Sequence, residues 1–152
     1  MSKTINLVEC EMDEQGRLFE TKLNLIETAF ISPSLYNTIT KDHPTVPIPI
    51  FESSVSGEHY TIDCFDSSEI ISIIGTLEDI FLRNMKSDSE NLLISDASYA
   101  QSNALTTSAD YLKVADLEES IARFREITNL IHLFKLKKNQ YSALPSVVLK
   151  VG

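Results

Sequence analysis

The first thirty residues alternate between apolar and polar positions, as strands with one buried face do. Ile5 and Leu7 share one face of the first segment, and Cys10 is a further candidate for it. Glu9 and Glu11 are assigned largely to the other face. A turn follows at 13–16, where the glycine suits a positive φ, and a second alternating segment starts at Leu18. The pattern predicts a β-hairpin.

Prolines interrupt the alternation after the hairpin. Ser32 followed by Pro33 predicts a short capped helical turn. Three prolines within 44–49 then require an extended path, so we expect a strand near 45–51. Proline cannot donate a ladder hydrogen bond, and this strand should therefore be an edge strand or a loop wall. Regular alternation returns in a strand near 59–65.

Two segments show the three-to-four-residue apolar spacing of amphipathic helices, near 67–85 and 116–138. Each opens with two acidic residues three positions apart, which resembles a capping box. Lysines gather at the end of the second helix, where the helix dipole favours positive charge. A proline then precedes a short strand near 146–151. The two acidic pairs are Asp66 with Glu69 and Asp116 with Glu119.

The segment 87–111 has no clear period. Its apolar run at 92–94 suggests a short strand, and the Ser-, Ala- and Thr-rich stretch 95–108 suggests a loop or a solvent-facing strand. The order of elements predicts a single α+β domain over 1–152. In it, a mainly antiparallel sheet (the N-terminal hairpin plus the strands near 45–51, 59–65 and 146–151) is packed by two helices.

Charge is distributed unevenly along the chain. The formal net charge is −9, yet residues 123–152 carry six basic side chains and one acid. Residues 1–90 carry 16 acids and six bases, and residues 91–122 carry five acids and one base. Binding to nucleic acid depends on neutralising phosphates with Lys and Arg, so we expect no nucleic-acid partner. The same acidity favours encounter with a basic protein, or serves solubility alone.

No stretch is apolar enough for a membrane span, and the N-terminus lacks the basic start and apolar run of a secretory signal. We therefore expect a cytoplasmic protein without membrane contact. Cys10 and Cys64 belong to no CxxC pair, and buried thiols are expected in preference to a disulfide.

The sequence contains no recognisable catalytic or metal-binding motif. His43, His59 and His132 stand at no metal-ligand spacing, and four scattered glycines form no phosphate-binding loop. There is no GxSxG elbow, and neither cysteine has an active-site context. We expect no enzyme activity and no cofactor.

The profile indicates a binding domain, a monomer or a homodimer, with a basic protein as partner. One such protein is an immunity protein, with which bacteria neutralise a basic nuclease or another toxin domain. A chaperone or adaptor for a secreted protein and an enzyme or small-ligand binder without a motif are the alternatives. The expected partner-binding carboxylates lie in the first half of the chain: Glu9, Glu11, Asp13, Glu14, Glu52, Glu58, Asp63 and Asp66.

Overall fold

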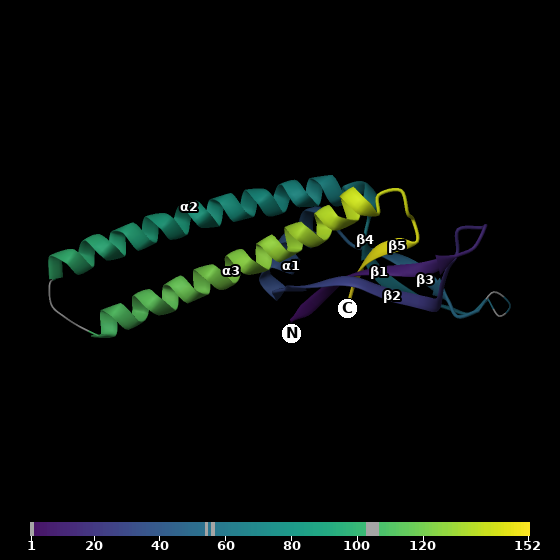
Figure 1. Cartoon of the computed structure of the whole chain (residues 1–152), viewed down its shortest axis with the longest axis horizontal. Coiled ribbons are helices and arrows are strands. Elements are labelled where there is room, and N and C mark those ends of the chain that lie inside the picture. The colour runs from purple at the N-terminus through teal and green to yellow at the C-terminus, as the bar shows by residue number, and fades with distance from the viewer. Residues whose placement is uncertain (1, 54, 56, 103–106) are drawn as a thin grey trace.

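The computed structural model describes residues 2–53, 55, 57–102 and 107–152, and the side chains in these ranges except those at 21–22 and 91–116. The protein is α+β, as the hydrophobic pattern predicts. A mainly antiparallel sheet forms a barrel, and two long helices cover one side of it (Figure 1). In chain order the elements are β1 (Lys3–Met12), β2 (Leu18–Ile31), α1 (Pro33–Asp42), β3 (Val46–Phe51), β4 (His59–Phe65), the 3-10 turn η1 (Ser67–Glu69), α2 (Ile70–Ser102), α3 (Thr107–Gln140) and β5 (Val147–Val151).

The strands follow one another around the barrel, and β5 closes it by pairing with both β4 and β1. All neighbours are antiparallel except β2 and β3, whose parallel pairing in the described chain covers two positions, beginning where Leu18 meets Ile50. Pro47 and Pro49 precede this contact and cannot donate to a ladder. The expected edge character of β3 thus holds along most of its β2 side, while its other side pairs with β4 throughout.

Two hydrophobic cores lie on opposite faces of the strands. In β5, Val147 and Leu149 face α2 and α3, while Val148 points into the barrel. This double burial explains why the strand is a continuous apolar run and does not alternate. The helix-facing core includes Ile5, Leu7, Ile31, Phe65, Ile73, Leu77, Leu130 and Phe134. The barrel core is smaller and consists of Val8, Cys10, Leu18, Ile50, Ile62, Cys64 and Val148.

Strand β1 corrects the predicted assignment of faces. Leu7 belongs to the helix-facing core, and Cys10 lies on the opposite face in the barrel core. Glu9 and Glu11 share a face with Leu7, because residues two apart in a strand point the same way. Both glutamates are nevertheless exposed. The irregularities of the β1–β2 ladder are register shifts in which β2 carries the extra residues. Such bulges bend a strand and help to close a barrel.

A buried histidine, His43, joins the end of α1 to the start of α2. Ser32 caps α1, as predicted, and the backbone N–H of His43 bonds back into the same helix at its other end. The His43 ring lies 2.6 Å from Glu69 Oε2 and 3.2 Å from Thr76 Oγ1. Asp66 caps η1 as expected, by accepting a hydrogen bond from the Ser68 backbone. The carboxylate of Glu69 contacts His43, which the capping-box pattern does not indicate.

The helices extend much further than the sequence pattern indicates. The strand predicted at 92–94 and the loop predicted from 95 onward are wrong, because α2 continues to Ser102 and α3 begins at Thr107. Asp116 accordingly lies inside α3 and does not cap it. Neither helix contains a proline, and no glycine follows Gly75 in α2, so nothing local interrupts them. Residues 103–106, part of the same predicted loop, lie outside the described residues.

A buried lysine closes the end of α3. Lys137 Nζ donates to the backbone oxygens of Tyr141 at 2.9 Å and Leu144 at 3.0 Å, in the turn that leads to β5. Burial lowers the pKa of Lys137. The predicted basic end of the helix is therefore partly internal. In the described part of the chain, neither long helix nor α1 is apolar and long enough to cross a membrane.

Candidate protein-binding surface at the mouth of the barrel

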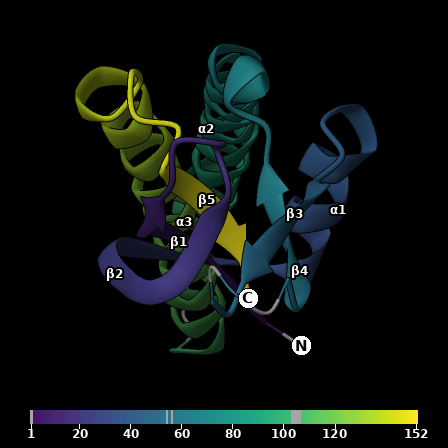
Figure 2. The same ribbon diagram turned by 90° about the vertical axis from the view of Figure 1, so that its right-hand side faces the viewer.

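Two turns rich in acidic residues lie at the end of the barrel that faces away from Ser102 of α2 and Thr107 of α3 (Figure 1). The turn 13–17 joins β1 to β2, and the turn 52–58 joins β3 to β4. Pairing of Leu18 with Ile50 brings the two turns together. Figure 2 faces this end of the molecule. We call it the barrel mouth and define it by the two turns together with Glu20 and Tyr60.

Tyr60 lies among carboxylates at the mouth. It continues the side of β4 that carries Ile62, and it is 37% exposed. Burial of the hydroxyl and the nearby negative charges of Glu20 and Glu52 raise the pKa of Tyr60, and Glu20 also accepts a hydrogen bond from it. The Glu52 backbone N–H donates to the oxygen of Glu58 at 3.1 Å, which closes the second turn. An amphipathic ring is thus placed beside several acids at an exposed end.

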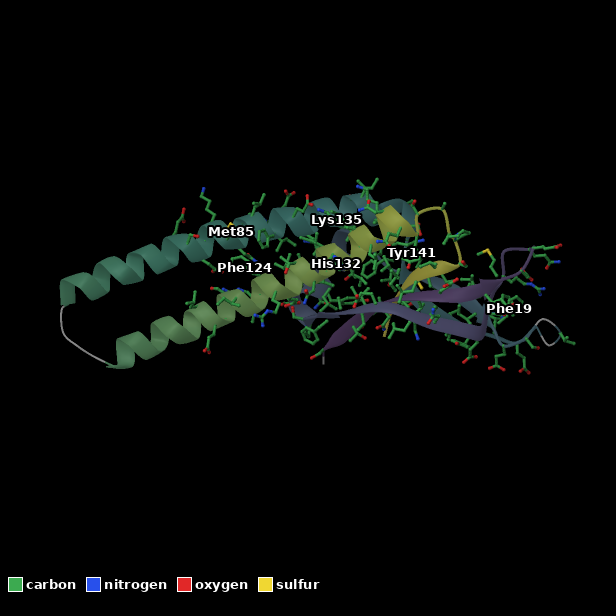
Figure 3. The ribbon with its side chains drawn as sticks, viewed as in Figure 1. Phe19, Met85, Phe124, His132, Lys135 and Tyr141 are labelled. Carbon is green, nitrogen blue, oxygen red and sulfur yellow. The ribbon has the colours of Figure 1, made fainter. Side chains whose placement is uncertain are left out.

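The arginine of the first turn, Arg17, forms an ion pair with Asp13 of the same turn. Asp13 accepts hydrogen bonds from the backbone of Gln15 at 3.0 Å and of Arg17 at 2.8 Å, and Arg17 Nε approaches its second oxygen at 2.7 Å. Desolvation opposes the shift, but the Arg17 hydrogen bonds hold the pKa of Asp13 below its usual value. The guanidinium of Arg17 lies 5.6 Å from the rings of both Phe19 and Phe51, and Figure 3 shows Phe19 at this end of the molecule. Arg17 therefore leaves much of the acidity of the mouth uncompensated.

The eight expected partner-binding residues do not form one patch. Asp63 and Asp66 lie toward the far end of β4, which at about 3.3 Å per residue is roughly 20 Å from the mouth. Asp13 and Asp66 hold local structure, as the turn and η1 show. The residues at the mouth are Asp13, Glu14, Glu52 and Glu58, and those on the flank of β1 are Glu9 and Glu11.

Sequence reasoning missed Glu20 as a member of this surface. It stands two positions after Leu18, so it shares the inward face of β2 and reaches the rim of the barrel. The alternation of faces along β2 therefore could have indicated that the Glu20 side chain points to the same side as Leu18. Its contact with Tyr60 joins residues 40 positions apart, and no local pattern indicates such a contact.

The two thiols are buried in the barrel core and are free. Desolvation raises the pKa of Cys64 to about 12 and, more modestly, raises that of Cys10. A thiol that keeps its proton at neutral pH is a poor nucleophile and a poor metal ligand. Among the described residues, no three His, Cys, Asp or Glu side chains converge as metal ligands do.

The described structure contains two clefts, and one of them reaches the mouth at Gly16 and Arg17. One, of about 560 Å³, runs beside the barrel core, and its apolar lining includes Met12, Ile48 and Phe65. The other, of about 500 Å³, lies between α1, α2 and α3, and polar groups such as Arg83 and Glu126 line it. Neither described lining includes a tyrosine, so Tyr60 belongs to the open mouth and not to these clefts.

No family model, no curated protein and no solved structure matches this chain.

Proposed function

We propose that the chain is a cytoplasmic protein-binding domain without enzyme activity, whose barrel mouth engages a basic surface of another protein. The observation that carries this proposal is the position of Tyr60 beside Glu20 and Glu52 at an exposed end, with Arg17 held by Asp13. Tyrosine combines a large apolar ring with a polar tip, which suits it to anchor an interface. Carboxylates around it match Lys or Arg in position and charge.

The finer form of this proposal is an inhibitor, such as an immunity protein that covers the active site of a basic nuclease or another toxin domain. Its support is the excess of acids, which repels nucleic acid and speeds encounter with a basic protein. The flank residues Glu9 and Glu11 extend the acidic surface from the mouth along β1.

The test neutralises the mouth without changing its shape. A variant with Glu20→Gln, Glu52→Gln and Glu58→Gln should bind a partner captured from the native cell at least about tenfold more weakly than the unchanged chain. Association should slow as salt rises from low to high, because the charges are exposed and screened. Both quantities can be measured by surface-based binding kinetics with the purified partner.

The matched control removes three charges elsewhere on the exposed surface, through Asp42→Asn, Asp79→Asn and Glu90→Gln. It changes the net charge by the same amount as the mouth variant, from −9 to −6. Its affinity should stay within about threefold of the unchanged chain, since exposed charges far from a contact contribute little. Equal binding by the mouth variant and the control would show that the mouth is not the interface.

The cleft beside the barrel core favours a second candidate, a binder of a small apolar ligand. Its volume of about 560 Å³ falls in the range of ordinary ligand sites, and most of its lining is apolar. An apolar fluorescent probe should then bind the native protein at one equivalent, and Ile48→Trp should abolish that binding by filling the cleft. Probe binding that is unchanged in Ile48→Trp would exclude this site.

A further inference from the structure

The two long helices extend well beyond the barrel as a hairpin (Figure 1). Near the barrel, one side of the hairpin packs on the strands through residues such as Leu77 and Leu130. The opposite side, which we call the outer face, is marked by the ion pair of Glu78 with Lys135 at 2.9 Å. In the described part of the chain, no element covers this face.

The outer face carries exposed apolar side chains. Leu82 is 61% exposed, and Met85, three residues later, is 41% exposed. On α3, Leu117 and Ile121 are each 44% exposed. A helix turns about 100° per residue, which places Leu82 and Met85 on the same side of α2 as Glu78.

The two helices present these residues together. Ile121 is 14 positions before Lys135, about four turns, and therefore lies on the side of α3 that pairs with Glu78. Phe81 and Phe124 meet at 5.3 Å between the helices, and Figure 3 shows Met85 close to this contact. The exposed apolar residues of α2 and α3 thus form one surface.

Charges on the two sides of α3 differ in their pairing. Arg123, on the side toward α1, meets Asp88 at 3.1 Å and Glu119 at 3.3 Å. Glu118 and Arg125 are exposed toward the outer face and have no ion-pair partner among the described residues. They stand three positions before and four positions after Ile121.

We propose that the outer faces of two copies of this chain pack together around a twofold axis near Ile121. When α3 crosses its symmetry mate in the antiparallel direction, Glu118 of each copy comes opposite Arg125 of the other. The same contact therefore forms twice, as a twofold interface requires. The apolar residues at its centre and the charges at its edge complement a second copy of the same surface.

The hairpin is long enough to carry a twofold interface of standard size. Helix α2 has 33 residues and α3 has 34, which is about 50 Å of length at about 1.5 Å per residue. Two helices of about 10 Å diameter side by side give the whole hairpin a footprint of roughly 1,000 Å², comparable with the roughly 800 Å² per partner of a standard interface. The barrel mouth lies at the other end of the molecule and stays open in the dimer (Figure 1).

The test is the molar mass in solution between about 1 and 100 µM, by light scattering and sedimentation. The unchanged chain should be a dimer across the upper part of this range. Ile121→Glu should raise the dissociation constant by at least about tenfold, because it buries two like charges at the axis. Leu144→Glu is the control, since Leu144 is equally exposed at 45% but lies in the turn before β5, and it should stay dimeric.

A charge exchange tests the twofold arrangement itself. Glu118→Arg alone and Arg125→Glu alone should each weaken the dimer about tenfold, because both contacts become repulsive. An equal mixture of these two variants should form a heterodimer, and the double variant should recover the original affinity to within about threefold. Both side chains are exposed, so far-UV circular dichroism should remain that of the unchanged chain.

A chain that is monomeric up to 100 µM would overturn the proposal. A dimer that tolerates Ile121→Glu, or single charge variants that do not prefer each other, would also overturn it. None of these results tests the proposed role of the barrel mouth, because the variants of the mouth change other residues.

Discussion

The helix-facing core and the barrel core share the same strands but differ in size and composition. The helix-facing core joins β1, β2, β4 and β5 to α1, α2 and α3 and contains an edge-to-face pair of Phe65 and Phe134 at 5.4 Å. The barrel core has seven buried residues, two of them cysteines, and no aromatic ring among its buried members. The comparison indicates that the helices supply most of the stability, while the barrel core mainly fixes the shape of the mouth.

The largest expected loss of stability comes from a substitution in the helix-facing core. Phe134→Ala removes a fully buried ring that contacts Phe65, and it should lower the free energy of unfolding by about 3–5 kcal/mol. Ile50→Ala in the barrel core should cost less, about 2–3 kcal/mol, since its smaller surroundings can close around the gap. Urea unfolding followed by circular dichroism measures both. An equal or larger cost for Ile50→Ala would reverse the ranking of the two cores.

The second prediction concerns the dependence of stability on pH, to which Cys64 of the barrel core contributes. The pKa of Cys64 is raised to about 12 from 9.0, chiefly by burial in the barrel core. Above pH 9 the unfolded chain releases this proton while the folded chain retains it, so stability should fall as pH rises from about 9 to 12. The slope from one such thiol is at most about 1.4 kcal/mol per pH unit.

Cys64→Val is the matched variant, because it keeps an apolar side chain of similar size. The loss of stability between pH 9 and 12 should become shallower in it by the contribution of that thiol. An unchanged slope would mean that Cys64 ionises equally in the folded and unfolded chain.

The smallest effect concerns α1, which adds Ile39 to the helix-facing core from outside the hairpin. Ser32→Ala removes the side-chain oxygen that accepts from the Leu35 backbone, and it should cost about 1 kcal/mol. The Ser32 backbone N–H, held by Glu126 at 2.6 Å, is unaffected by this change. A shift in the urea midpoint without a change in slope would confirm a simple loss of stability.

The existence of the strands was predictable from local pattern, whether one face or both faces are buried. The hairpin of β1 and β2 follows from alternation, and β5 follows from an apolar run after a proline. The outer halves of α2 and α3 were not predictable in the same way, because the apolar period that marks a core-facing helix fades after Phe81. In these halves, the absence of Gly and Pro is the feature of the sequence that agrees with a continuous helix.

The closure of the barrel and the contacts at its mouth could not be predicted from local pattern. Closure depends on the short parallel contact of Leu18 with Ile50, and the mouth depends on Tyr60 meeting Glu20. Such contacts join distant positions, and only the packed fold brings them together. The exposure of the acids in the two turns, including Glu52 and Glu58, could be predicted from sequence because turns are polar and exposed.

The pairing of Ile5 with Val151 connects positions 146 residues apart in the chain. On the ribosome, β1 and β2 therefore emerge long before β5 and wait with one side of β1 unpaired. The intervening helices can form early, since their contacts are local. Insertion of β5 between β1 and β4 is then the natural slow step of folding, and it is the step at which two unfinished barrels are most exposed to exchanging strands.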